Sequence, residues 1–456
     1  MIFETGKYLE KFREKEAYSC GGKIFSYGEL YERAKEISSE ILKSGAKTAA
    51  VLGNENFETM AAVIACVFSK CAYVPVDVFL PEERREIIIK SSGASLIIDC
   101  SAEKTKIIKI FDETNEEENK IAYIIFTSGS TGKPKGVPVS YDNLSNFIEW
   151  ITKLEPLKNY ENISVLNHAS FGFDLSTAAI YYSLFCGHRL VQVRNTGDYK
   201  KLFSEIKKNK PAVIVATPTF LRLCLLDEHF SEKEYPFLKC IYFCGEVLKK
   251  SLAEAIFKRF PDMRMLNAYG PTEATSAVCA IEITKDVLEQ EEILPVGKIS
   301  SAAAEIITEK EEIVLKGKSV FGGYLGGVTG GHFFENGKNC YRTGDLGFIK
   351  NGKLYCKGRK DSQIKYKGYR IELSDIEANI SEIGGIEDCA VVAKKNPEGE
   401  VRFIKAFVCG KITEEELRIE LSKKLPEYML PKTIKFLKEF PQSQNGKIDR
   451  KVLEKL

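Results

Sequence analysis

The sequence predicts an α/β fold with a large N-terminal domain and a small, mobile α+β C-terminal domain. Three observations lead to this prediction. The chain has 456 residues, which is too many for one ordinary hydrophobic core. From Tyr27 to about Phe260, short apolar runs alternate with amphipathic helical segments. From about Glu292 the pattern changes to short strands set between glycines, and after Asp361 a smaller unit follows.

The N-terminal region is expected to form parallel sheets flanked by helices. Leu30, Ala34, Ile37 and Ile41 repeat at helical spacing, and Gly45 is placed to end that helix. Strands separated by helices favour parallel sheets that are covered on both faces. The predicted strands are Thr48–Leu52, Ala72–Val76, Leu96–Ile98, Ile121–Phe126, Val165–Asn167, Leu190–Val193, Val213–Ala216 and Ile241–Phe243.

The rest of the chain is expected to form a β-rich subdomain and then the small domain. Glu312–Leu315 and Lys353–Cys356 have the composition of short antiparallel strands. We place the boundary within 358–362, so the two domains cover residues 1–360 and 361–456. The small domain is predicted to contain a helix near Ser374–Ile383, strands near Cys389–Ala393 and Arg402–Cys409, and a helix near Glu414–Leu425.

Composition and charge argue against several classes of protein. The 66 basic and 64 acidic residues nearly cancel, so we expect no nucleic-acid partner. The thirteen cysteines contain no Cys-x-x-Cys pair, which favours free thiols in a reducing compartment. Met1–Glu16 lacks a signal core, and Met60–Phe68 is shorter than the roughly 18–20 apolar residues of a membrane span. The prediction is a cytoplasmic protein without membrane insertion.

One loop has the composition of a phosphate-binding site. Thr127-Ser-Gly-Ser-Thr-Gly-Lys-Pro-Lys-Gly136 directly follows the apolar run Ile121–Phe126. Its hydroxyls and backbone N–H groups can donate to phosphate oxygens, and Lys133 and Lys135 supply positive charge. The common P-loop pattern is not matched, because Pro134 follows Lys133. A flexible surface loop has the same composition, so the residues alone leave both interpretations open.

This loop resembles the signature loop of the adenylate-forming superfamily, which holds acyl-CoA synthetases, luciferases and nonribosomal-peptide adenylation domains. Motifs similar to those of its amino-acid-activating branch occur in order over nearly the whole chain. They are Phe25–Leu30, Ala72–Asp77, Phe173–Ser176, Asn267–Glu273, Tyr341–Asp345, Gly358–Asp361, Tyr369–Leu373, Leu425–Pro431 and Asn445–Arg450. The resemblance implies a ligase that uses ATP and Mg²⁺ to adenylate a carboxylate.

The resemblance also implies a nucleotide site. Tyr269 would stack on adenine, Thr272 would contact the α-phosphate, and Glu273 would help to hold Mg²⁺. Asp345, assisted by Arg359, would bind the ribose hydroxyls. Taken alone, Glu273 would also fit a plain turn, and an Asp and an Arg in loops are most often solvated. The implied nucleotide-binding positions are Thr127, Ser128, Gly129, Ser130, Thr131, Gly132, Lys133, Lys135, Asn267, Ala268, Tyr269, Gly270, Asp345 and Arg359.

Two further positions are implied to act in catalysis and in domain movement. Lys447 would lie between the substrate carboxylate and the α-phosphate, where a point charge stabilises developing negative charge. Asp361 resembles a hinge at which the small domain swings between two half-reactions. In the second state, Lys365–Arg370 would face the active site. The alternatives are a solubilising lysine near the C-terminus and an aspartate that caps a turn.

Asp174 bears on the substrate. In the amino-acid-activating branch, an aspartate at this position pairs with the α-ammonium, which needs an opposite charge when it is buried. A helix-capping aspartate is the alternative interpretation. The resemblance implies pocket walls at Leu175, Cys244, Ala268 and Ser276, with further candidates at Ala178, Tyr242 and Ala277.

The segments Tyr242–Leu248, Tyr269–Thr275 and Ala280–Thr284 resemble the stand-alone D-alanine–D-alanyl carrier protein ligases. Those ligases charge a carrier protein that is used to decorate teichoic acids. The resemblance implies activation of a small amino acid, D-alanine, and transfer to the phosphopantetheine thiol of a separate carrier protein. Ser276 stands where these relatives often have an apolar residue such as valine, and small amino acids differ by only about 1–3 kcal/mol in such pockets. A nonribosomal-peptide-type enzyme for another amino acid therefore remains open.

Two functions besides amino acid activation are compatible with the predicted fold. An acyl- or aryl-CoA ligase would share the fold, but Asp174 argues against it. A non-catalytic nucleotide-binding regulatory homologue would keep the fold without turnover, but the intact motifs, including Glu273, Asp345 and Lys447, argue against it.

Overall fold

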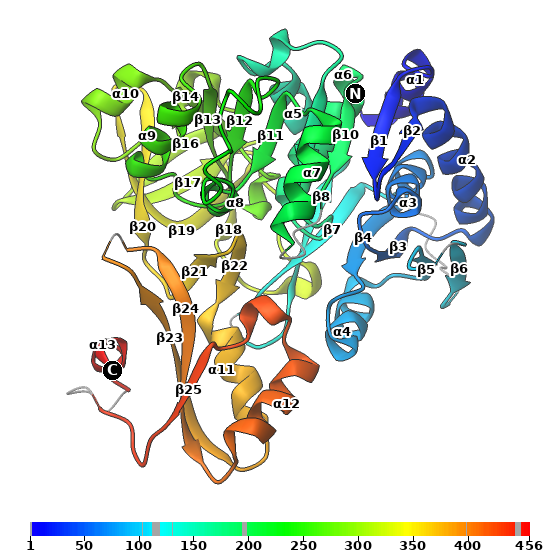
Figure 1. The fold of residues 1–456 in the computed structure, drawn as a ribbon. Coiled ribbons are helices and arrows are strands. Elements are labelled where there is room, and N and C mark those ends of the chain that lie inside the picture. Colours follow the sequence, from blue (N-terminus) through cyan, green and yellow to red (C-terminus); the bar gives the residue numbers. More distant parts are fainter. Residues whose placement is uncertain are drawn as a thin grey trace. The chain divides into compact units, whose positions relative to one another are not determined.

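The computed structural model describes residues 2–102, 104–111, 119–129, 131–193, 198–397, 399–442 and 448–456 (Figure 1). The chain divides into two units by its internal contacts. The first unit comprises Met1–Asp77, Ser91–Ile125 and Gly136–Lys360, and the second comprises Val78–Lys90, Phe126–Lys135 and Asp361–Leu456. The last segment of the second unit thus begins at Asp361. The role of this residue as a hinge stays a prediction.

The largest sheet of the first unit has eight strands in the order β14-β13-β12-β11-β9-β10-β1-β2. Its strands from β13 to β1 are parallel, as predicted, because their apolar runs are buried on both faces. The edge strands β2 and β14 pair antiparallel with their neighbours. The strands are β1 Glu16–Cys20, β2 Lys23–Ser26, β9 Ser164–Asn167, β10 Arg189–Gln192, β11 Val213–Ala216, β12 Cys240–Phe243, β13 Arg264–Tyr269 and β14 Cys279–Ile283.

A six-stranded sheet has the order β6-β5-β3-β4-β7-β8. The central strands β5, β3, β4 and β7 are parallel, and β6 adds an antiparallel edge. Helix α2, Tyr27–Ser44, begins with a capping box between Ser26 and Glu29 and ends at Gly45, whose φ is 72°. The strands are β3 Thr48–Gly53, β4 Ala72–Asp77, β5 Leu96–Asp99, β6 Lys106–Lys109, β7 Ile121–Thr127 and β8 Lys135–Ser140.

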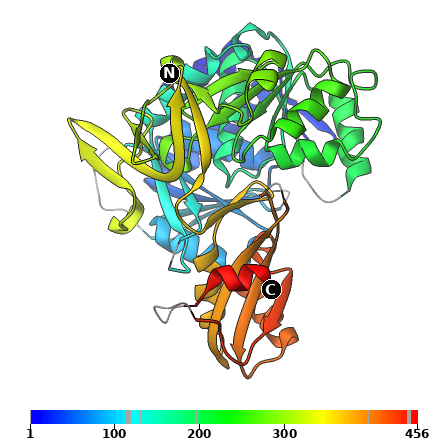
Figure 2. The same cartoon turned by 90° about the vertical axis from the view of Figure 1, so that its left-hand side faces the viewer.

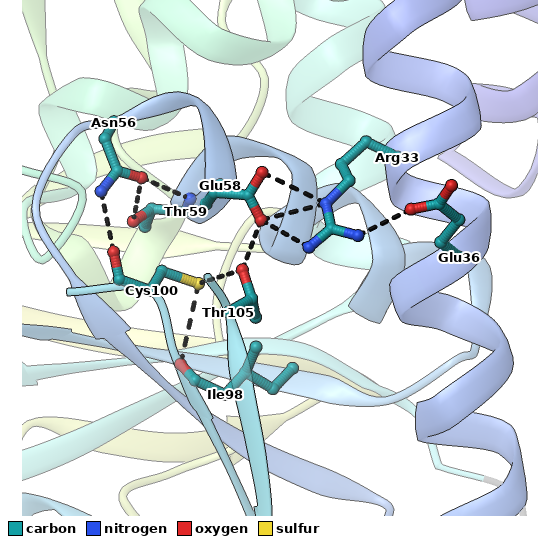
Figure 3. A network of polar contacts seen from close by, with 8 residues as sticks. All are labelled: Arg33, Glu36, Asn56, Glu58, Thr59, Ile98, Cys100 and Thr105. Atoms are coloured by element: carbon teal, nitrogen blue, oxygen red, sulfur yellow. Dashed lines mark hydrogen bonds and ion pairs between the residues drawn. The ribbon is translucent and has the colours of Figure 1, made fainter. Parts of the chain in front are cut away.

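Polar contacts tie α2 to α3, Phe57–Phe68, and to the connection between β5 and β6 (Figure 3). Arg33 binds the Glu58 carboxylate through Nε and through Nη2 at 2.7 Å, and Thr105 donates to the same carboxylate. Burial alone would raise the pKa of Glu58, but these hydrogen bonds and the Arg33 charge outweigh burial and lower it. Asn56 caps α3 and donates to the Cys100 carbonyl at 2.8 Å.

The β-rich part of the first unit is an antiparallel sheet in the order β15-β20-β19-β17-β16, with β18 paired to β19. The predicted strands Glu312–Leu315 and Lys353–Cys356 are both present. The strands are β15 Gly297–Lys298, β16 Glu305–Glu309, β17 Glu312–Lys316, β18 His332–Glu335, β19 Lys338–Lys350 and β20 Lys353–Arg359.

The second unit contains a three-stranded sheet in the order β23-β24-β25 and the hairpin β21-β22 (Figures 1 and 2). Ile376 of α11 and Leu417 of α12 belong to the main core of this unit, whereas Leu453 of α13 packs with Phe407 in a separate cluster. The elements are β21 Gln363–Tyr366, β22 Tyr369–Glu372, β23 Ile386–Lys395, β24 Val401–Gly410, β25 Thr433–Phe436, α11 Leu373–Ser381, α12 Glu414–Lys424 and α13 Arg450–Lys455.

The remaining α-helices are α1 Thr5–Lys11, α4 Glu82–Ser92, α5 Tyr141–Thr152, α6 Asp174–Cys186, α7 Tyr199–Asn209, α8 Pro218–Cys224, α9 Lys250–Arg259 and α10 Lys285–Gln290. Short 3₁₀ helices are η1 Ile2–Glu4, η2 Leu157–Asn159, η3 Thr272–Ala274, η4 Ile299–Ser301, η5 Leu325–Gly327 and η6 Glu427–Met429. Within the described ranges, no helix has both the length and the apolar character needed to cross a membrane.

All thirteen cysteines are free thiols, and most of them are buried. Burial raises the pKa of Cys20 and Cys186, two of the less buried ones, to about 11. Thiols in such surroundings stay protonated near neutral pH.

Candidate active site

A carboxylate, a phenol and a guanidinium meet in the first unit. Asp345, only 3% exposed, accepts hydrogen bonds from Tyr269 Oη at 2.8 Å and from Arg359 Nη1 at 2.6 Å. The register of β19 and β20 sets Asp345 opposite Arg359, and Tyr269 is the last residue of β13. Burial and the Asp345 charge raise the pKa of Tyr269, so the phenol remains a donor. Three residues predicted for adenosine binding therefore lie together.

Glu273 is fully buried in the 3₁₀ helix η3. Tyr324 Oη donates to Glu273 Oε1 at 2.6 Å and lies 3.1 Å from Tyr341 Oη. Burial and the Glu273 charge raise the pKa of Tyr324 far above its ordinary value, so this phenol also stays a donor. A carboxylate fixed in this way suits Mg²⁺, which takes oxygen ligands and usually only one or two carboxylates.

Tyr324 was not predicted as a site residue. It follows Glu273 by 51 positions and belongs to none of the motifs. No periodicity links a phenol to a carboxylate over such a distance. The tertiary fold brings the two together, because the connection between β17 and β18 runs beside η3, where Phe321 N donates to the Glu273 carbonyl at 2.9 Å.

Asp174 is the first residue of α6, and Phe173 is the N-cap residue of this helix. Asp174 therefore does not occupy the capping position, although its charge suits the positive end of the helix dipole. The pKa values of Tyr123 on β7 and Tyr242 on β12 are both raised, mainly by burial and additionally by the Asp174 charge. The carboxylate thus lies near two buried phenols that come from two different sheets.

The predicted pocket-wall residues are buried, and two of them are in contact. Cys244 Sγ lies 3.8 Å from the carbonyl oxygen of Ser276, and Leu175, Ala268 and Ser276 are each at most 5% exposed. Ser276 has a φ of 68°, in the left-handed region. Its hydroxyl and that of Tyr242 are buried and have no hydrogen-bond partner among the described residues.

A tight turn holds this wall in place. A Cβ at Gly270 would lie 2.5 Å from the Ala277 Cα, so only glycine fits at this position. The Asn267 amide donates to the carbonyl of Pro295 at 2.8 Å, and Thr272 is buried. These positions support the turn, and their contact with a nucleotide stays a prediction.

The predicted phosphate loop belongs to the second unit. A Cβ at Gly129 would overlap the carbonyl oxygen of Lys133, so the loop closes on itself only with glycine at this position. Gly132 N donates to the Gly129 carbonyl at 3.2 Å, and Gly132 has a φ of 82°. Thr131 and Lys133 are exposed, whereas the Thr127 hydroxyl is buried.

Two predicted site residues, Ser130 and Lys447, lie outside the described residues. Lys135 is half-buried at the start of β8. Asp361 accepts a hydrogen bond from Gln363 N at 3.2 Å, so its carboxylate also supports the turn that follows.

Known proteins are similar to this chain over almost its whole length. Residues 7–325 match the family described as AMP-binding enzyme, and residues 375–447 match the AMP-binding enzyme C-terminal domain. Proteins named D-alanine–D-alanyl carrier protein ligase from Listeria monocytogenes and Lactococcus lactis are 37% and 36% identical to it. The alignments cover 99% and 94% of this chain, and 98% and 93% of those proteins.

A solved structure agrees in fold. The adenylation domain AlmE of Vibrio cholerae, in complex with glycyl-adenosine-5'-phosphate, matches with a TM-score of 0.86 and 24% identity. The match covers 99% of this chain and 96% of that one. Since the family description covers more than half of the sequence and full-length relatives exceed a third identity, this chain belongs to the family of AMP-binding enzymes.

Proposed function

We propose that this chain converts D-alanine and ATP to D-alanyl-adenylate and then transfers the D-alanyl group to the phosphopantetheine thiol of a separate carrier protein. The observation that carries the proposal is the Asp174 charge near the buried phenol of Tyr242, which also lies near the buried Cys244. The relatives named for this activity add support, since they align over almost their full length.

In the first half-reaction, a carboxylate oxygen of the amino acid attacks the α-phosphorus, and the bond to pyrophosphate breaks. Asp174 would pair with the α-ammonium and hold the carboxylate in line with the phosphorus. Lys447 would stabilise the negative charge that develops between them. Mg²⁺ held by Glu273 would supply positive charge to the phosphate oxygens. Tyr324 would keep the Glu273 carboxylate in position for this task.

In the second half-reaction, the thiol sulfur attacks the carbonyl carbon, AMP leaves, and a thioester forms. Tyr269, Asp345 and Arg359 would hold the adenosine half during both steps. Each Asp345 oxygen accepts one hydrogen bond from these neighbours and has capacity for another, which suits a pair of ribose hydroxyls.

The unpartnered hydroxyls of Ser276 and Tyr242 favour a second candidate substrate. A buried hydroxyl without a partner costs free energy, and a hydroxyl on the substrate would provide one. D-Serine differs from D-alanine by this one group. A pocket of this kind discriminates such pairs only modestly, by about 1–3 kcal/mol.

ATP–pyrophosphate exchange with D-alanine, L-alanine, glycine, D-serine, octanoate and benzoate tests the proposal. We expect D-alanine to give the highest kcat/KM, followed by D-serine. Exchange with octanoate or benzoate alone would indicate an acyl- or aryl-activating enzyme. ATP binding without exchange for any acid would indicate a non-catalytic homologue.

A further inference from the structure

The second unit contains a buried ion pair between residues that are far apart in the sequence. Arg84 on α4 donates to Asp375 on α11, with Nη2–Oδ2 at 2.9 Å and Nη1–Oδ1 at 3.3 Å. The two side chains are only 7% and 0% exposed. Two charges removed from water in this way need close mutual contact and further hydrogen bonds.

Asn379, one helical turn after Asp375, provides such a bond and extends the contact to the phosphate loop. Its Nδ2 donates to Asp375 Oδ1 at 3.0 Å and to the Gly132 carbonyl at 3.3 Å. A Cβ at Gly132 would lie 2.7 Å from the Ala378 Cβ, so α11 packs directly against the loop. Arg84, Asp375 and Asn379 thus form one polar chain that ends on the loop.

A second tie holds the other side of the loop. Ser128 Oγ donates to the Arg370 carbonyl at 3.1 Å and accepts from Glu372 N at 2.9 Å. Both partners lie on β22, and Arg370 is the last residue of the segment 365–370 that is predicted to face the active site in the second half-reaction. The Ser128 hydroxyl therefore donates its proton to a backbone carbonyl in this arrangement.

The path of the chain relates these contacts to the predicted hinge. Val78–Lys90 and Phe126–Lys135 are both flanked in sequence by segments of the first unit, whereas Arg370, Asp375 and Asn379 follow the predicted hinge at Asp361. A swing at that hinge would have to break the ion pair and both ties to the loop. Separating a buried ion pair costs free energy, so the Arg84–Asp375 contact is expected to be either fully formed or fully broken, with few states in between.

We propose that Arg84, Asp375 and Asn379 form a latch that positions the phosphate loop for the second half-reaction. They are positioning residues, because they act through the loop and not on the substrate. This inference rests on the proposed two-step function. The latch and pyrophosphate would compete for the same loop, so the latch closes after the first half-reaction.

Activity measurements on the full-length chain test the latch with D-alanine as the amino acid and free pantetheine as the thiol. Arg84→Gln and Asp375→Asn should each slow transfer from preformed D-alanyl-adenylate about 10-fold, a typical coupling effect, and leave pyrophosphate exchange unchanged. The double variant should be no worse than either single one, because both substitutions break the same contact. Arg84→Lys keeps the charge and should lie between wild type and Arg84→Gln.

Glu83→Gln is the matched control. Glu83 neighbours Arg84 on α4 and pairs with Lys424 at 3.3 Å, but it is half exposed. Loss of the Glu83 charge should leave the rates of both half-reactions unchanged, since exposed ion pairs contribute little to stability.

Amide hydrogen exchange provides a readout that needs no substrate. Peptides covering residues 126–135 should exchange faster in Arg84→Gln and Asp375→Asn than in wild type or Glu83→Gln. Equal slowing of both half-reactions, or unchanged exchange in 126–135, would overturn the latch. Absence of D-alanine-dependent pyrophosphate exchange in the wild type would instead contradict the proposed function, while the hydrogen-exchange result would still decide whether Arg84 holds the loop.

Discussion

Among single residues, Asp174 is expected to have the largest effect on substrate binding. Asp174→Asn keeps the shape of the side chain and removes its charge. We expect the KM for the amino acid to rise on the order of 100-fold, because a buried ammonium is costly without an opposite charge. Pyrophosphate exchange measured at varied D-alanine and at varied ATP concentrations separates an effect on the KM for D-alanine from an effect on the KM for ATP. An unchanged KM for D-alanine would remove Asp174 from the pocket.

Tyr324 is predicted to act through Glu273, to which its hydroxyl donates a hydrogen bond. Tyr324→Phe removes the hydroxyl that holds Glu273 and should lower the kcat of pyrophosphate exchange about 10-fold, because the carboxylate loses its fixed orientation. In a titration with Mg²⁺, the variant should need a higher Mg²⁺ concentration to reach half of its maximal exchange rate. Tyr355→Phe is the control, since that phenol donates to Glu291 at 2.6 Å, outside the predicted site. The same loss in both variants would argue against a role for Tyr324 in holding the carboxylate.

His168 makes stability depend on pH. Burial lowers its pKa to about 4, and its ring stacks on Phe220 with 4.1 Å between centroids. As pH falls from about 6.5 towards 4, the unfolded chain takes up a proton that the folded chain does not. Folding should therefore lose about 1.4 kcal/mol per pH unit from this group. Urea unfolding of His168→Phe should show a smaller difference in the free energy of unfolding between pH 7 and pH 5 than wild type. His188, whose pKa is also lowered to about 4, should keep part of the slope in this variant.

At the scale of elements, the phosphate loop depends on glycine at one position. Gly129→Ala would place a Cβ on the Lys133 carbonyl oxygen and force the loop open. We expect pyrophosphate exchange to fall on the order of 100-fold, since loss of preorganised phosphate donors has effects of this size. Gly384→Ala, where a Cβ meets no atom within 4 Å, is the control in the same unit. Retained exchange in Gly129→Ala would show that the loop does not hold the phosphates.

The sequence predicted elements well where local pattern decides them. The helix ending at Gly45 and the buried strands β11 and β12 were predictable, because apolar periodicity and a left-handed C-cap are local signals. The strands β1 and β2 were not, since they are short and the pairing of β1 with β10 depends on distant residues. Tyr324 was missed for the same reason, whereas Tyr269, Asp345 and Arg359 were found through their motifs.

At the scale of the whole molecule, the two half-reactions are predicted to use different parts of the small domain. Lys447→Ala should reduce pyrophosphate exchange on the order of 100- to 1,000-fold, because it removes a charge needed only in adenylation. Transfer from preformed D-alanyl-adenylate to pantetheine should remain close to normal. Lys455→Ala, an exposed lysine of α13, is the control. Equal loss of both reactions in Lys447→Ala would contradict the assignment of separate states.

The half-buried thiols of Cys20 and Cys186 matter in a protein that makes a reactive acyl phosphate anhydride. Such an intermediate acylates whatever thiolate reaches it first, including those of the protein that made it. Burial raises the pKa of Cys20 and Cys186 to about 11, so both thiols stay protonated near neutral pH. The chain is thereby protected from modifying itself at these two positions, and the acyl group remains available for the intended acceptor.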